Sequence, residues 1–125
     1  KHISLNVAAE EKLPIIKADA EKSAWVLINF LTNAIRYSPE HSTVTIELKH
    51  KGNSVVFAVQ DVGKGIDVRY RDKIFDRYFQ VPGSSKSGTG LGLSISKEFI
   101  EVQGGTIGVE SEIGMGSRFY FTLSA

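Results

Sequence analysis

The chain has 125 residues, a formal net charge of +1 and no cysteine. This length suits one domain with a buried core, and the near-zero charge gives no indication of a nucleic-acid surface. The absence of cysteine excludes disulfides and thiolate metal sites. No apolar run reaches the roughly 18 residues of a membrane span. Because the chain begins at Lys1 without an initiator methionine, we expect residues 1–125 to be a single domain from a longer protein.

The first part of the chain predicts two extended segments and a long helix. Residues 2–7 alternate apolar and polar side chains, and residues 13–17 form a second short extended segment. Asp19 is a suitable cap for a helix that runs to about Arg36, and Pro39 ends it. The predicted apolar stripe of this helix consists of Ala24, Leu27, Ile28, Leu31 and Ile35.

The rest of the chain predicts two hairpins, an aromatic run and a second helix. Residues 44–48 and 55–59 alternate around Gly52-Asn53, which is typical of a hairpin. An aromatic run at 74–79 precedes a Gly- and Ser-rich loop at 80–90. A helix over 91–102 is followed by Gly104-Gly105 and a closing hairpin of residues 106–110 and 117–123. These blocks favour an α+β fold, a two-layer sandwich with helices on one face of a mixed sheet.

Three polar residues of the first helix, Asn29, Asn33 and Arg36, share one face, roughly opposite the predicted stripe. A solvated polar face is the ordinary explanation of such a pattern. Asparagine is a poor helix former, however, so it is an unusual choice for a merely wet face. A carboxamide oxygen suits Mg²⁺ that is shared with phosphates, and an arginine suits phosphate itself.

Asp61 follows a predicted strand and precedes Gly63 and Gly65. Asp and Gly are common in turns, so a plain strand-end turn is one interpretation. The other is a carboxylate that accepts a hydrogen bond from the exocyclic amine of a purine, with glycines that let the base approach the backbone.

A second glycine cluster, Gly88, Gly90 and Gly92, opens the second helix. It lacks the pattern of a P-loop and that of a dinucleotide fingerprint. Two explanations stay open. The glycines form either a flexible hinge or a lid that leads into a helix whose N-terminus faces phosphate.

The remaining aromatic and histidine residues give weaker signals. Phe75, Tyr78 and Phe79 are more typical of a core than of an interface. The histidines at positions 2, 41 and 50 are expected to be surface groups, with no acidic neighbour arranged as a dyad.

Four segments in order resemble the motifs of bacterial sensor histidine kinases. Asn29-Phe-Leu-Thr-Asn33-Ala-Ile-Arg-Tyr-Ser-Pro39 resembles the N box, and Asp61-Val-Gly-Lys-Gly65 the G1 box. Ile74-Phe-Asp-Arg-Tyr-Phe79 resembles the F box, and Gly88-Thr-Gly-Leu-Gly-Leu93 the G2 box. The likeness covers essentially the whole chain, and it implies an ATP-binding catalytic domain of the Bergerat type.

The resemblance also implies residue roles. Asn33 would hold Mg²⁺, with Asn29 toward the phosphates, Arg36 on the phosphates and Tyr37 near the adenine. Asp61 would accept from the adenine amine. The residues implied to shape the adenine pocket are Gly63, Gly65 and Ile66. Those implied to form the lid are Gly88, Thr89, Gly90, Leu91 and Gly92.

Further implied roles concern the partner domain and the charge on the lid. Phe75 and Phe79 would face the partner domain. Gln80 stands where many family members carry an arginine, so Arg77 or Lys86 is expected to supply the positive charge.

The implied function is transfer of the ATP γ-phosphate to a histidine on a separate dimeric helical domain, upstream of a response regulator. The isolated chain would be a monomer and a cytoplasmic part of a homodimeric inner-membrane sensor. The alternatives are an ATP hydrolase of the gyrase or chaperone kind, a nucleotide-sensing module and a serine-directed kinase. In the hydrolases a Glu replaces Asn29 as the base, and a carboxamide cannot accept that proton.

Overall fold

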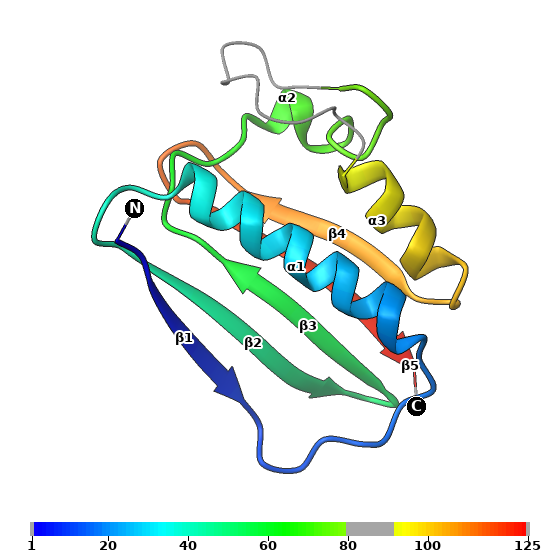
Figure 1. Ribbon diagram of the computed structural model, residues 1–125. Coiled ribbons are helices and arrows are strands. Elements are labelled where there is room, and N and C mark those ends of the chain that lie inside the picture. Colours follow the sequence, from blue (N-terminus) through cyan, green and yellow to red (C-terminus); the bar gives the residue numbers. More distant parts are fainter. Residues whose placement is uncertain (1, 80–91, 125) are drawn as a thin grey trace.

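The computed structural model describes residues 2–79 and 92–124, which form a curved sheet and three helices (Figure 1). The elements in chain order are β1 (Ser4–Ala9), α1 (Ala20–Tyr37), β2 (Thr43–Lys51), β3 (Ser54–Gln60), α2 (Val68–Arg71), α3 (Gly92–Glu101), β4 (Thr106–Ser111) and β5 (Ser117–Ser124).

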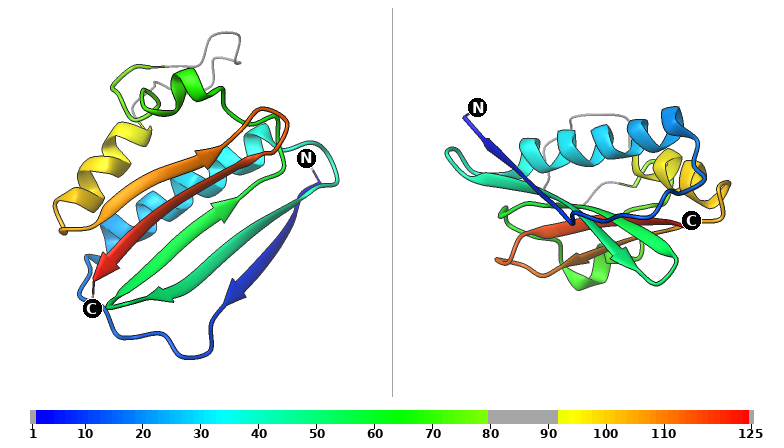
Figure 2. Two further views of the ribbon diagram at one scale, coloured as in Figure 1. Left: turned by 180° about the vertical axis from the view of Figure 1, so that it is seen from behind. Right: turned by 90° about the horizontal axis from the view of Figure 1, so that it is seen from below.

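The sheet has the strand order β1-β2-β3-β5-β4. β1 pairs in parallel with β2, and the other neighbours are antiparallel, so the sheet is mixed. The long helices α1 and α3 lie on one face of it (Figure 2). This arrangement confirms the predicted α+β sandwich and both predicted hairpins.

The ends of α1 follow local signals. Asp19 caps the first turn by accepting a hydrogen bond from the backbone N–H of Lys22. At the other end, Ser38 donates from its hydroxyl to the carbonyl of Ala34 over 2.6 Å. The backbone is extended at Ser38, as expected for the residue before Pro39.

The buried face of α1 differs from the predicted stripe. Val26, Phe30 and Ala34 are buried, whereas Ile28 is 61% exposed. Apolar residues occupy two sides of this helix, so its periodicity alone does not decide which side packs. The aromatic side chains of β5 decide it, since the ring of Phe30 contacts Phe119 and Phe121 at centroid distances of 5.4 and 6.0 Å. The polar residues Asn29 and Asn33 therefore flank the buried line instead of lying opposite it.

Two further details were not predicted correctly. Residues 13–17 form no strand but connect β1 to α1 as irregular chain. The short helix α2 was not predicted; it begins after Asp67, which accepts from the backbone N–H of Arg69. It packs beside β4, the edge strand of the sheet. None of the helices in the described ranges is long and apolar enough to cross a membrane.

Candidate functional site

Asp61 directly follows β3, and the residue is buried, with 5% of its surface exposed. Its Oδ1 accepts hydrogen bonds from the backbone N–H groups of Gly63, at 2.9 Å, and Ser117, at 3.1 Å. Within residues 2–79 and 92–124, no hydrogen bond ends at Oδ2. Burial raises the pKa of the Asp61 carboxyl above its ordinary value, and the two backbone donors offset this only in part. In the described part of the chain, Asp61 thus has one oxygen that accepts two hydrogen bonds and one that accepts none.

The glycines after Asp61 are held by close packing. A Cβ on Gly63 would lie 2.6 Å from the carbonyl oxygen of Tyr37, which is the last residue of α1. Gly65 has a φ of +78°, and a Cβ there would lie 2.0 Å from the carbonyl oxygen of Glu112. Next to it, the backbone N–H of Ile66 donates to Ser111 Oγ over 2.8 Å. The loop therefore lies with bare backbone against the carbonyl groups of Tyr37 and Glu112. Packing within the protein accounts for both glycines, and their role beside a purine stays a prediction.

Along α1, the polar residues lie one turn apart and meet two different partners. Arg36 donates from Nη1 to Oδ1 of Asn33 over 3.3 Å. Asn29 donates from Nδ2 to Ser96 Oγ over 3.2 Å, and Ser96 belongs to α3. A Cβ on Gly92, the first residue of α3, would lie 2.7 Å from Asn29 Oδ1. Asn29 thus faces the N-terminal turn of the second helix.

These contacts bring most of the predicted nucleotide-binding residues into one continuous line. Asp61 holds Gly63, and Gly63 lies against Tyr37 at the end of α1. Arg36 precedes Tyr37 directly, Asn33 lies one turn back along the same helix, and Asn29 lies two turns back, where it faces Gly92. The predicted residues Lys86, Gly88, Thr89, Gly90 and Leu91 lie outside the described residues.

The residues predicted to face a partner domain are only partly exposed. Phe75 and Phe79 both pack against the core, and the ring of Phe75 meets Phe119 edge-on at 6.4 Å. Tyr78 between them is 70% exposed with a φ of +62°. Arg77 donates from Nη2 to Glu98 Oε1 of α3 over 2.8 Å. The partner-facing role of the two phenylalanines stays a prediction.

Sequence reasoning missed several residues of the site. Ser96 contacts Asn29, Ser117 donates to Asp61, and Glu98 pairs with Arg77. Ser94 and Ser96 are both buried inside α3. Serine is unusual inside a helix because its hydroxyl competes for backbone hydrogen bonds. The two serines in α3 could therefore have indicated a helix face with polar contacts. Ser117 and Glu98 gave no such signal.

One prediction about the histidines was wrong. His2, His41 and His50 are exposed as expected, but His2 does have an acidic neighbour. Its Nδ1 lies 3.1 Å from Glu40 Oε1. The two residues are 38 positions apart, so spacing in the sequence could not reveal the pair.

Comparison with known proteins accounts for this arrangement. The family model described as "Histidine kinase-, DNA gyrase B-, and HSP90-like ATPase" matches residues 18–125. The chain belongs to this ATPase family. Within the family it is similar to sensor histidine kinases, as the four sequence motifs implied, and it is an ATP-binding catalytic domain of that kind.

Two curated relatives illustrate the match. KinB of Pseudomonas aeruginosa, an alginate biosynthesis sensor protein, is 37% identical over 123 residues, which are 98% of this chain and 20% of KinB. ZraS of Escherichia coli, a sensor histidine kinase, is 38% identical over 123 residues, which are 98% of this chain and 26% of ZraS. The chain thus spans about a fifth to a quarter of the length of these relatives.

Solved structures in the family have the same fold. Full-length ShkA, solved in complex with AMPPNP, superimposes with a TM-score of 0.85 at 31% identity, over 98% of this chain and 26% of ShkA. The catalytic domain of the histidine kinase ThkA gives a TM-score of 0.84 at 30% identity, over 98% of this chain and 78% of ThkA. The helices and mixed sheet are therefore those of a histidine kinase ATPase domain.

The described residues fit such a nucleotide. Asp61 Oδ2 accepts no hydrogen bond within the described residues, and a carboxylate oxygen suits an exocyclic amine. Asn33 offers a carboxamide oxygen, which is a hard ligand that suits Mg²⁺. Arg36 beside it supplies a positive charge for phosphate.

Proposed function

We propose that this domain binds ATP together with Mg²⁺ and donates the γ-phosphate to a histidine on a separate dimerisation domain. The observation that carries the proposal is the line of contacts from Asp61 through Gly63 and Tyr37 to the polar face of α1. It supports the proposal because the residues that we propose as purine acceptor, metal ligand and phosphate donors lie on adjoining segments. Phosphoryl transfer needs mainly positioning and charge neutralisation, and these residues supply both.

The residue roles are divided along this line. Asp61 fixes the adenine base, because its second oxygen accepts a hydrogen bond from the exocyclic amine. Gly63, Gly65 and Ile66 line the adenine pocket. Tyr37 packs near the base. Arg36 and Asn29 bind phosphate oxygens, and Asn33 holds the metal, which when bound neutralises charge on the phosphates.

The acceptor histidine lies elsewhere in this proposal. His2, His41 and His50 are outside the nucleotide-binding line, and His2 is occupied by Glu40. The relatives that the chain matches are several times longer than it, which supports a parent protein with further domains. We propose that this parent is a homodimeric sensor kinase at the inner membrane, with this domain in the cytoplasm, and that it phosphorylates a response regulator.

The runner-up function is steady ATP hydrolysis. Asn29 argues against it, because its carboxamide cannot serve as a general base toward water. Its Nδ2 also donates to Ser96, so the side chain is oriented as a hydrogen-bond partner. A nucleotide sensor without transfer is the remaining alternative.

Transfer can be tested with a helical dimerisation domain that carries an acceptor histidine. The domain is mixed with it and γ-labelled ATP, and we expect label on the acceptor but not on a matched acceptor whose histidine is replaced by glutamine. Rapid phosphate release with no labelled acceptor would support the hydrolase instead. Nucleotide binding without transfer or release would support the sensor.

A further inference from the structure

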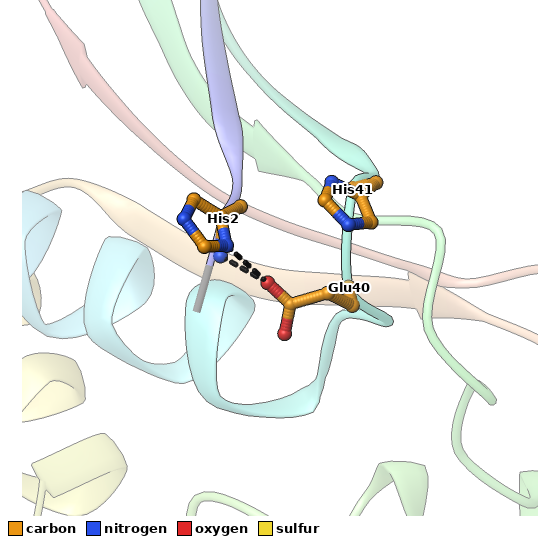
Figure 3. Close-up of side chains that lie close together, drawn as sticks. All are labelled: His2, Glu40 and His41. Carbon is orange, nitrogen blue, oxygen red and sulfur yellow. Dashed lines mark hydrogen bonds and ion pairs between the residues drawn. The ribbon is translucent and has the colours of Figure 1, made fainter.

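Two histidines and one glutamate form the group of potential metal ligands in the described part of the chain. His2, Glu40 and His41 each offer one ligand atom, and these atoms lie within 4.8 Å of one another. Figure 3 shows the Glu40 carboxylate beside the ring of His2, with the ring of His41 next to them. The group lies at the start of β1, outside the line of residues assigned to the nucleotide.

The backbone holds these residues in place independently of their side chains. His41 donates from its backbone N–H to the carbonyl of His2 over 2.8 Å, and the N–H of Ser4 donates to the carbonyl of Ser42 over 3.0 Å. The parallel pairing of β1 with β2 continues from there, with Ser4 opposite Thr43. The three side chains are therefore brought together by the sheet itself.

The ligand atoms of the three side chains lie close together on the surface. His2 Nδ1 lies 3.1 Å from Glu40 Oε1, and the backbone N–H of His2 donates to the same oxygen. The rings of His2 and His41 are stacked, with centroids 5.6 Å apart and planes 8° apart, so one ring has to rotate about its side-chain bonds to bring both nitrogens to one ion. His41 has a φ of +64°, a conformation that few residues with a side chain adopt. This turn directs the ring of His41 alongside that of His2.

We propose that His2, Glu40 and His41 form a binding site for Zn²⁺, with water completing the coordination. Two imidazoles and a carboxylate suit a borderline metal ion, whereas Mg²⁺ prefers oxygen ligands alone. Zinc with three protein ligands and one open position is common, with ligand distances of about 2.0–2.2 Å. All three side chains are exposed, so they can close around the ion without disturbing the core.

A plain ion pair between protonated His2 and Glu40 is the competing explanation of this cluster. It accounts for the 3.1 Å contact but gives His41 no role. Bound zinc would connect the segment entering β1 to the segment leaving α1, since Glu40 follows the last residue of α1 by three positions. The site does not depend on nucleotide binding, so its failure would leave the proposed function untouched.

The direct test is titration with zinc, without any polyhistidine tag and with the N-terminus acetylated so that the terminal amine cannot coordinate. We expect calorimetry to show one equivalent of Zn²⁺. At a free zinc concentration about 100 times the dissociation constant, the melting temperature should rise by about 10 °C.

Three variants and one control identify the ligands. His2→Asn, Glu40→Gln and His41→Asn should each weaken zinc binding by about tenfold or more; asparagine suits position 41 because it tolerates positive φ. His50→Asn removes an exposed histidine on β2 that is outside the cluster, and it should leave affinity unchanged. Melting curves without zinc check that every variant folds. Absence of stoichiometric binding, or equal losses in the control and the His2 variant, would overturn the proposal.

Discussion

Arg36 donates from Nη1 to Oδ1 of Asn33 over 3.3 Å, one turn apart on α1. The oxygen that we assign to the metal thus accepts a hydrogen bond from a cationic side chain. Because a cation nearby disfavours a second one, Mg²⁺ should bind Asn33 only when phosphates are present to attract Arg36. The metal site and the phosphate site are therefore expected to form together.

Asn33→Ala should make ATP binding less dependent on magnesium. Loss of the carboxamide removes a protein ligand, so the gain in ATP affinity on adding Mg²⁺ should shrink by about tenfold. Calorimetric titrations of ATP with and without Mg²⁺ measure this gain in affinity. Thr32→Ala is the matched control, since Thr32 is an exposed neighbour on the same helix. An Asn33→Ala domain that keeps the full magnesium response contradicts the ligand assignment.

Asp61→Asn should weaken ATP binding without unfolding the domain. An asparagine can still accept from Gly63 and Ser117 through its carbonyl oxygen, but its NH₂ group would meet the adenine amine as a second donor. Loss of a charge-assisted hydrogen bond of about 1.5–3 kcal/mol corresponds to about 10- to 100-fold in affinity. Competition with a fluorescent nucleotide measures the change in ATP affinity. Unchanged affinity would remove Asp61 from the base pocket.

The same carboxylate should affect how stability depends on pH. Burial raises its folded pKa above the ordinary value of 3.8. At pH values between the unfolded and the folded pKa, the folded state therefore binds more protons than the unfolded state. Stability from this group therefore decreases as pH rises from the unfolded pKa through the raised folded pKa. The carboxyl groups of Asp19, Glu47 and Asp67 have lowered pKa values and act in the opposite direction, so urea unfolding at a series of pH values should show the Asp61 contribution as a difference between the wild type and Asp61→Asn. The stability of the wild type relative to Asp61→Asn should fall as pH rises through the raised pKa; parallel curves for the two proteins would contradict the prediction.

Gly63→Ala should destabilise the domain and weaken nucleotide binding. The new Cβ would lie 2.6 Å from the backbone oxygen of Tyr37, and a backbone atom cannot turn away as a side chain can. A cost of about 1–3 kcal/mol in the free energy of unfolding is expected for such overpacking. Lys64→Ala, an exposed neighbour in the same loop, is the control and should change little. A Gly63→Ala domain of native stability would show that the loop can move.

Local signals in the sequence predicted the elements well. The cap at Asp19 and the turn at Gly52, with its φ of +60°, depend on residues close to each other in the chain. The buried face of α1 was not predictable from the helix alone, because the packing partners Phe119 and Phe121 are about 90 residues away in the chain.

Contacts across the chain were the least predictable part of the site. The motif order indicated Asp61, but its hydrogen bond from Ser117 joins residues that are 56 positions apart. Asn29 and Ser96 are 67 positions apart, and only the packing of α1 on α3 brings them together. Spacing carries no information about such pairs, because the register of the sheet and the helix crossing set them.

Arg77 is held by α3 in this structure, and its release can be tested. Its Nη2 contacts Glu98 Oε1 at 2.8 Å, and this carboxylate raises the pKa of Arg77, which therefore stays charged. If Arg77 stabilises charge on the transferred phosphate, Arg77→Gln should slow transfer by about tenfold or more. Glu98→Gln removes only the partner, so transfer should persist. Both variants should melt near the wild-type temperature, because exposed ion pairs contribute little to stability.

Lys86→Gln is the companion variant, because Lys86 is the other candidate for this charge. Single-turnover transfer to the acceptor domain is the measurement for all three proteins, with ATP affinity recorded alongside to separate binding from transfer. Slow transfer in Arg77→Gln alone assigns the charge to Arg77, and slow transfer in Lys86→Gln alone assigns it to Lys86. Wild-type rates in both variants would contradict the idea that either residue replaces the arginine that many family members carry where this chain has Gln80.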